Sequence, residues 1–319
     1  MSDLLSTTAA AMSRAPQPRT CILICTYERQ LAAAQLTRRL LDRYWRNHPQ
    51  VWLCGVSIDD EAALPLRDNP ADWMAVTRSA VGDLINMGFE RVYLIMADSG
   101  PMDQCHEHHL NQTVPVWMTE LDAVYISVRG WDHRRNSWGR SLGRRYLSLQ
   151  QQAAEHWNRF SLDPALWRID VLAGILDILL TNEGLGNHSA WAFERDAGRL
   201  HEKLPKAWNE RTYRVCGRLM SATPIPAPER WARHGFDGLI RWADKTFNHK
   251  HRRKALPPKI LPLWQKALML NSVYYQGPYP MHFAGFLVRG SLNPELVRFL
   301  KRAGRQDLLQ EIEATVPSR

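Results

Sequence analysis

One segment of the sequence places several metal-binding or polar side chains directly behind a run of apolar residues. The run 91–96 reads RVYLIM, Asp98 follows it, and a Ser-Gly-Pro turn leads to Cys105 and three nearby histidines. A carboxylate at the end of a buried strand can hold a metal ion or a ribose hydroxyl, and its alternative is a turn cap. Cysteine and histidine are zinc ligands. The segment therefore indicates either a ligand-binding sheet edge or a zinc centre.

The cluster at 105–109 does not complete a zinc site by itself. Within a helix, Cys105 shares a face with His108 and His109, but adjacent residues diverge by about 100° around the axis. A third ligand has to come from elsewhere, and the sequence does not mark one. The alternatives are a substrate-contacting histidine, for which His106 is the candidate, and solvated or capping histidines. A zinc-dependent hydrolase stays among the functions to be tested.

Whether these side chains lie close together depends on the fold. The pattern of the first 130 residues predicts that fold. Apolar runs at 21–25, 51–58, 91–96 and 123–128 are typical of buried strands, and amphipathic helical spacing separates the first three. Alternation of this kind predicts an α/β fold with a mostly parallel sheet flanked by helices on both faces. Ligands of such sheets bind at the carboxyl ends of the strands. The polar residues expected at this edge are Thr26, Tyr27, Arg29, Asp59, Asp60, Asp98, Arg129, Trp131 and Asp132.

Beyond Gly139 the sequence predicts mainly helices. They are expected at 142–157, at 161–182, from about 189, and from 293 to about 314. In the second of these, Asp163 is the expected N-cap and Pro164 the first helical residue. Two apolar segments, 212–220 and 282–290, are expected to extend the sheet as strands.

The domain plan follows from these elements. Residues 1–19 lack the basic and apolar regions of a signal peptide and are expected to form a disordered leader. Residues 20–220 form the α/β domain, and 221–319 form a helical extension packed on it. The extension includes a basic loop at 245–254, which is either a solvated charge run or a contact for anionic lipid.

Composition restricts the class of protein. The 319 residues carry a net charge of +9, with 41 Lys and Arg against 32 Asp and Glu, which favours polyanionic partners. No nucleic-acid-binding module is present and the basic residues are not gathered on one helix, so specific nucleic-acid binding is only a competing hypothesis. Glycine-rich dinucleotide and P-loop motifs are also missing. The odd number of cysteines, 5, most of them in strand-like runs, indicates reduced thiols and a cytoplasmic location.

Two stretches resemble the GT-A type glycosyltransferases. CILICTYERQ is similar to their first strand and the loop beside the nucleotide base, and FSLDPALWRIDVL followed by SAWAFER is similar to the Pro-Ala-Leu/Ile-Trp and Trp-x-Phe-Glu segments of a bacterial polysaccharide-type group. The resemblance covers roughly residues 20–195. It implies a GT-A fold, a nucleotide-sugar donor, and a glycan or lipid-linked acceptor. The cysteines and the basic loop add the expectation of a cytoplasmic enzyme that can lie at the inner membrane face. The donor-binding residues it implies are Thr26, Tyr27, Arg29, Asp59, Asp60, Arg78, Asp98, Arg134 and Arg135.

The sequence departs from this family at the metal motif. Where the family has Asp-x-Asp, the chain has only Asp98, flanked by Ala97 and Ser99. Either Asp98 holds Mn²⁺ or Mg²⁺ together with the donor phosphates, or arginines such as Arg134 and Arg135 neutralise the phosphates without a metal. The incomplete motif also leaves open a GT-A-like partner protein without catalytic activity.

Glu194, in SAWAFER, is the predicted catalytic base. A carboxylate partly desolvated by Trp191 and Phe193 has the raised proton affinity needed to accept the proton of an attacking hydroxyl. The alternative is a first-turn glutamate that pairs with Arg195. Asp132 is the reserve candidate for the catalytic carboxylate.

Aromatic residues complete the predicted site. Sugar faces stack on aromatic rings, so Trp131, Trp138 and Trp191 are the candidates for an acceptor platform. Most of the other tryptophans among the 13 are expected to pack in the core. The site as a whole depends on one geometric expectation: Tyr27, Asp59, Asp98 and Glu194 should surround a shared hollow.

Overall fold

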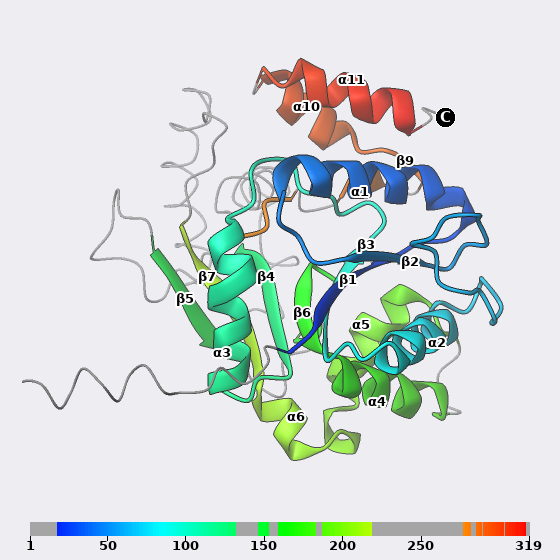
Figure 1. Ribbon diagram of the computed structural model, residues 1–319, viewed down its shortest axis with the longest axis vertical. Coiled ribbons are helices and arrows are strands. Elements are labelled where there is room, and N and C mark those ends of the chain that lie inside the picture. Colours follow the sequence, from blue (N-terminus) through cyan, green and yellow to red (C-terminus); the bar gives the residue numbers. More distant parts are fainter. Residues whose placement is uncertain are drawn as a thin grey trace, which may run out of the picture.

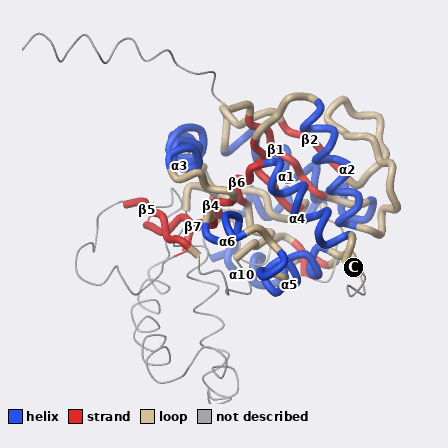
Figure 2. Tube along the Cα trace, turned by 90° about the horizontal axis from the view of Figure 1, so that it is seen from below, coloured by secondary structure: helices blue, strands red, loops and turns tan. Residues whose placement is uncertain are grey.

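The protein is described by a computed structural model for residues 18–131, 146–152, 159–182, 187–218, 277–281, 285–288, 290–302 and 304–316. Its centre is a seven-stranded sheet of order β2-β1-β3-β6-β4-β7-β5 (Figures 1 and 2). The strands are β1 (Thr20–Cys25), β2 (Val51–Cys54), β3 (Arg91–Met96), β4 (Tyr125–Trp131), β5 (Tyr146–Gln151), β6 (Ala165–Arg168) and β7 (Thr212–Arg218). β5 and β6 run opposite to the other five, which are parallel to one another. The mostly parallel sheet predicted from the sequence is confirmed.

Helices cover both faces of the sheet (Figure 1). α1 (Leu31–Tyr44) and α3 (Val114–Glu120) lie on one face; α2 (Trp73–Asn86), α4 (Ile169–Leu180) and α5 (Ala190–Arg199) lie on the other. The sequence of β1 is continuously apolar because both faces of the strand are buried. Cys21, Leu23 and Cys25 belong to the core under α2 and α4, whereas Ile22 and Ile24 belong to the core under α1. A strand buried on both faces has no polar alternation.

Shorter elements connect these layers. They are the 3₁₀ turns Glu28–Gln30 and His201–Lys203, the π-helical turn His109–Thr113, and α6 (Lys206–Glu210). Local caps agree with the sequence: Asp72 accepts a hydrogen bond from the amide of Ala75 at the start of α2 (2.9 Å), and Ser189 accepts one from Ala192 at the start of α5 (3.2 Å). The helix predicted from about 189 is confirmed. Within the described residues, no helix is both long and apolar enough to cross a membrane.

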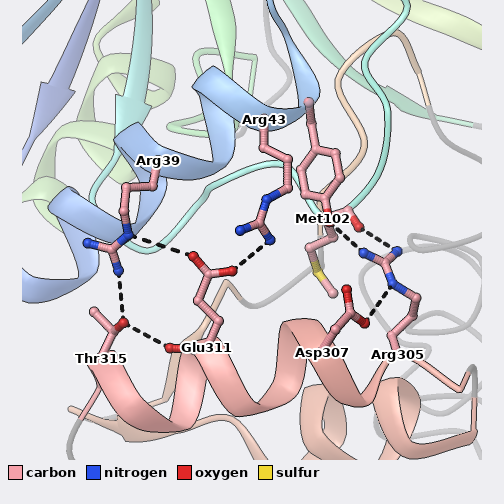
Figure 3. Close-up of polar contacts among 8 residues, drawn as sticks. Arg39, Arg43, Met102, Arg305, Asp307, Glu311 and Thr315 are labelled. Carbon is pink, nitrogen blue, oxygen red and sulfur yellow. Dashed lines mark hydrogen bonds and ion pairs between the residues drawn. The ribbon is translucent and has the colours of Figure 1, made fainter.

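The last described elements pack on the outer side of α1. β8 (Leu287–Val288) and β9 (Ser291–Leu292) form a hairpin, and α10 (Pro294–Arg302) and α11 (Gln306–Thr315) follow. Leu308, Leu309 and Ile312 share a core with residues of α1. Figure 3 shows the charged rim of this contact, in which Glu311 lies between Arg39 and Arg43, with Nη1 of Arg43 2.6 Å from Oε2 of Glu311.

Arg305 completes that rim between α10 and α11. Its guanidinium donates to the Tyr44 hydroxyl (2.5 Å) and to the Met102 carbonyl (3.3 Å), as Figure 3 shows. The pKa of Arg43 is raised: although burial acts to lower it, the hydrogen bonds to Tyr44 and Glu311 outweigh that effect. The C-terminal helices are therefore held by a buried apolar face with an ionic border.

Four expected elements were wrong. The segment predicted as helix 142–157 contains strand β5, whose residues alternate in the way a strand requires. The helix predicted at 161–182 begins only at Ile169, because 165–168 is strand β6, so Asp163 is not its N-cap. Segment 282–290 does not extend the sheet, since its described part pairs only with β9. The closing helix is two helices separated by a turn at Gly304, whose φ is +69°.

Candidate active site

The candidate site is the edge at which the five parallel strands end. β6 begins at this edge, because its first residue, Ala165, pairs with Leu94 of β3 and with Ser127 of β4. The loops behind β1, β2 and β3 and the end of β4 therefore lie at the same edge as the segment 159–164 that leads into β6. This arrangement collects polar groups from five separate parts of the chain, as expected for a sheet with a ligand at its carboxyl edge.

The β1 and β2 loops approach each other closely. The amide of Thr26 donates to the carbonyl of Cys54 (3.0 Å), and Gly55, with φ +89°, lies so close that an added Cβ would be 2.0 Å from the Thr26 carbonyl oxygen. Only glycine fits there. The Thr26 side chain is buried, and the next residue, Tyr27, is 40% exposed. The ring of Tyr27 is therefore available at the edge for contact with a ligand.

The two adjacent aspartates behind β2 have different environments. Asp60 accepts a hydrogen bond from the amide of Ala62 (2.8 Å) and pairs with Arg38 of α1 (2.9 Å). The pKa of Asp60 is lowered, chiefly by the Ala62 amide and also by Arg38. Asp60 therefore acts as a turn cap in this loop. Asp59 is exposed, so it is the one of the two whose carboxylate is open to solvent.

Asp98, behind β3, is enclosed by the C-terminal segment. The Phe286 amide donates to the Asp98 carbonyl (2.8 Å), and the Leu287 amide donates to the Asp98 carboxylate. Gly285 has φ +67°, and an added Cβ would lie 2.7 Å from Oδ2 of Asp98. Burial raises the pKa of Asp98 to about 6, against the lowering effect of hydrogen bonds from its own amide, the Leu287 amide and the Ser99 side chain.

The described residues do not assemble a site for a divalent cation. No group of three or more His, Cys, Asp or Glu side chains with suitable placement occurs among them. The Asp98 carboxylate already accepts a hydrogen bond from the Leu287 amide. A second carboxylate of the same loop, Asp103, is buried and accepts a hydrogen bond from the Gln104 amide (2.8 Å). Both carboxylates are therefore engaged by backbone amides.

The described residues hold no group of three or more His, Cys, Asp or Glu side chains that would make 105–109 a zinc site. Cys105 is 4% exposed and belongs to the apolar core with Tyr93 and Tyr279, and burial raises the pKa of its thiol. His109 lies in the π-helical turn and contacts the Thr113 hydroxyl (3.1 Å). Burial, followed by the neighbouring His108, lowers the pKa of His109. His106 is partly exposed, and its amide donates to the Pro278 carbonyl.

Glu194 reaches the edge from α5 and is held through one oxygen. Oε1 accepts hydrogen bonds from the Leu162 amide (2.6 Å) and from the Ser161 hydroxyl (3.2 Å). No described residue donates to Oε2 within hydrogen-bonding distance. Burial raises the pKa of Glu194; the Leu162 amide is the strongest opposing influence. The carboxylate thus combines a fixed orientation with a raised proton affinity.

A buried ion pair lies beside Glu194. Nη1 of Arg129 in β4 is 2.6 Å from Oδ1 of Asp163, and the two side chains are 4% and 14% exposed. The Val128 amide donates to the Pro164 carbonyl (2.9 Å), which continues the β4–β6 pairing up to this ion pair. Sequence reasoning missed the role of Asp163, because it assigned that residue to a helix N-cap.

Two predicted residues make contacts that differ from expectation. Trp191 is 81% exposed, so it does not desolvate Glu194, and Phe193 packs against Trp73 and Trp167 in the core. Arg78 pairs with Asp177 (2.7 Å) between α2 and α4, so its guanidinium is occupied within the helical layer. Trp191 keeps the exposed surface that an acceptor platform needs.

Several predicted residues cannot be placed. Asp132, Arg134, Arg135, Trp138 and the basic loop 245–254 lie outside the described residues, and the side chain of Trp131 is not described. Among those that can be placed, Tyr27, Asp59, Asp98 and Glu194 all come from segments at the carboxyl edge. Arg29 is exposed in the 3₁₀ turn behind β1.

Comparison with known proteins adds little to this geometry. No protein-family model and no curated protein matches the chain. It is similar to a crystal structure of S. aureus TarS 1-349 at 11% identity and a TM-score of 0.31, covering 80% of this chain and 81% of that chain. The complexes of TarS 1-349 with UDP-GlcNAc and with UDP give 12% and 11% identity and TM-scores of 0.29 and 0.31, with 93% of this chain and 82% of each of those chains covered. At TM-scores this low, the likeness carries no argument about this chain.

Proposed function

We propose that the protein is a glycosyltransferase that moves a sugar from a nucleotide-sugar donor to a hydroxyl group of a glycan or lipid-linked acceptor. The observation that carries the proposal is the state of Glu194 at the carboxyl edge of the sheet. Oε1 is fixed by the Leu162 amide, Oε2 is without a donor among the described residues, and burial raises the pKa. A general base that takes a proton from a hydroxyl at near-neutral pH needs these properties.

The proposed reaction is a direct displacement. The acceptor oxygen attacks the anomeric carbon while Glu194 takes its proton on Oε2, and the bond from that carbon to the nucleoside diphosphate breaks, with its electron pair leaving on the phosphate oxygen. The exposed Tyr27 ring is assigned to the nucleotide base and Asp59 to the ribose hydroxyls. Trp191, one short turn before Glu194 on α5, is assigned to the acceptor sugar.

Charge on the leaving diphosphate is assigned to protein arginines. The described carboxylates fit a divalent cation poorly, so we propose that Mn²⁺ or Mg²⁺ is not held by Asp98 and that Arg134 and Arg135 neutralise the phosphates. Equal donor binding with and without a chelator supports this assignment. A requirement for Mn²⁺ that the Asp98→Asn substitution abolishes would reverse it.

Binding and turnover test the function separately. Titration of UDP, GDP and their sugar conjugates into the protein, followed by calorimetry, should give saturable binding for one nucleotide class. Turnover should then be lost in Glu194→Gln, which keeps the shape and hydrogen bonds of the side chain but cannot accept the proton, while donor binding is kept. Glu120→Gln, at an exposed glutamate of α3, is the matched control. Absence of binding for every nucleotide would refute the proposal.

The incomplete metal motif favours one second candidate, a GT-A-like partner protein without activity. It predicts nucleotide binding with no turnover and a cellular phenotype that Glu194→Gln leaves unchanged. The zinc-hydrolase alternative has no comparable support, because Cys105 lies in the core. We further propose that the enzyme works in the cytoplasm and meets a lipid-linked acceptor through the basic loop 245–254.

A further inference from the structure

We infer that the Arg129–Asp163 ion pair positions the carboxylate of Glu194, through the turn at Ser161 and Leu162, so that Oε2 faces the acceptor. The inference rests on the proposed function, in which Glu194 is the catalytic base. It assigns Ser161, Asp163 and Arg129 as positioning residues, since none of them has to touch the substrate.

The turn at 161–163 acts as a cradle for one carboxylate oxygen. The Leu162 amide donates to Oε1 of Glu194 at 2.6 Å. The Ser161 hydroxyl donates to the same oxygen at 3.2 Å, while it accepts a hydrogen bond from the Asp163 amide at 3.1 Å. A single hydroxyl thus links the backbone of the turn to the carboxylate. The direction of both bonds leaves Oε2 as the oxygen that can take a proton.

The cradle is fixed from β4 rather than by α5 itself. Arg129 binds the Asp163 carboxylate at 2.6 Å, and the Tyr125 hydroxyl donates to the Ser161 carbonyl at 3.2 Å. Both anchoring side chains are buried, so the contacts are shielded from solvent. A buried ion pair is weak evidence for stability, because the cost of desolvation offsets the attraction. Its placement beside a carboxylate with a raised pKa favours a role in holding that group.

The charges of the pair act on Glu194 in opposite directions. Asp163 raises the pKa of Glu194 and Arg129 lowers it, while burial is the largest influence. Tyr125, whose hydroxyl donates to the Ser161 carbonyl, is buried with a raised pKa and stays neutral. Loss of the Asp163 charge should leave Arg129 uncompensated and so lower the pKa of Glu194. Loss of the Ser161 hydroxyl removes a donor to the ionised form and should raise it.

The test is a measurement of the Glu194 carboxyl itself. The full chain, labelled with ¹³C at the glutamate carboxyl, is titrated by NMR, and Glu194→Gln identifies the resonance. We expect a lower pKa in Asp163→Asn and a higher one in Ser161→Ala. Asp177→Asn, which removes the acidic member of the Arg78 ion pair on α4, is the matched control and should leave the resonance unchanged.

The outcomes separate the inference from the function on which it rests. If the two variants shift the Glu194 titration in opposite directions, the positioning role stands even for a protein that transfers no sugar. In an active enzyme, the acid limb of the kcat/KM profile should move in the same direction as the measured pKa. A Glu194 titration unchanged in both variants overturns the inference. If Asp163→Asn does not fold, Ser161→Ala decides alone, because it removes only one hydroxyl.

Discussion

Gly285 offers the sharpest test of how the C-terminal segment is joined to the sheet edge. Its φ of +67° is a conformation that costs an L-residue with a side chain roughly 1–2 kcal/mol. An added methyl group would also lie 2.7 Å from both the carbonyl oxygen and Oδ2 of Asp98, and overpacking of this kind costs about 1–3 kcal/mol. We therefore expect Gly285→Ala to lower the free energy of unfolding by roughly 2–5 kcal/mol.

Gly290 supplies the matched control. Its φ of +77° is similar, but an added Cβ there would meet no atom of the described residues within 4 Å. Gly290→Ala should therefore cost only the conformational part, roughly 1–2 kcal/mol. Urea unfolding followed by tryptophan fluorescence measures both variants. Equal losses in the two would show that the close approach of Gly285 to Asp98 does not contribute, and would refute the reasoning.

Three further predictions concern the same framework. The raised pKa of Asp98 means that ionising this carboxyl group costs more free energy in the folded state than in the unfolded state. The resulting loss of stability is absent below pH 4 and develops as the pH rises through about 6. Relative to the parent protein, the free energy of unfolding of Asp98→Asn should therefore rise by up to about 3 kcal/mol between pH 4 and pH 8. Unfolding experiments at both pH values measure this change, and a difference that does not depend on pH contradicts the prediction. Asp72→Ala removes the N-cap of α2 and should lower the free energy of unfolding by about 1 kcal/mol, whereas Asp72→Asn retains the cap. Thermal unfolding of the two variants measures the difference. Leu309→Ala should lower the free energy of unfolding by about 2–5 kcal/mol, and Leu309→Met should lower it by less than about 1.5 kcal/mol. Similar losses in the two variants would show that α11 is loosely packed.

The first half of the fold is readable from the sequence for a physical reason. Strands β1 and β3 are buried on both faces and so appear as unbroken apolar runs, and amphipathic helices with one buried side separate them. The same property hides β6. Residues 165–180 form one mainly apolar segment, and its periodicity alone does not show that its first 4 residues are a strand and the remaining 12 a helix.

The candidate residues were selected on different grounds. Asp98 was chosen because it follows a buried strand, and Glu194 because SAWAFER resembles a segment of the GT-A family. The Arg129–Asp163 pair depends on the antiparallel alignment of β4 with β6, which sequence spacing does not reveal. Once β6 is known to be a strand that pairs Ser127 with Ala165, counting two residues outward brings Arg129 opposite Asp163.

The packing of Gly285, Phe286 and Leu287 on Asp98 has a consequence for biosynthesis. Asp98 leaves the ribosome long before its hydrogen-bonding partners, which are translated nearly two hundred residues later. During this interval the edge of the nascent sheet is uncovered beside β3, and chaperones or proteases can reach it. A ribosome that stalls before residue 285 therefore leaves a chain in which Asp98 lacks these hydrogen-bonding partners.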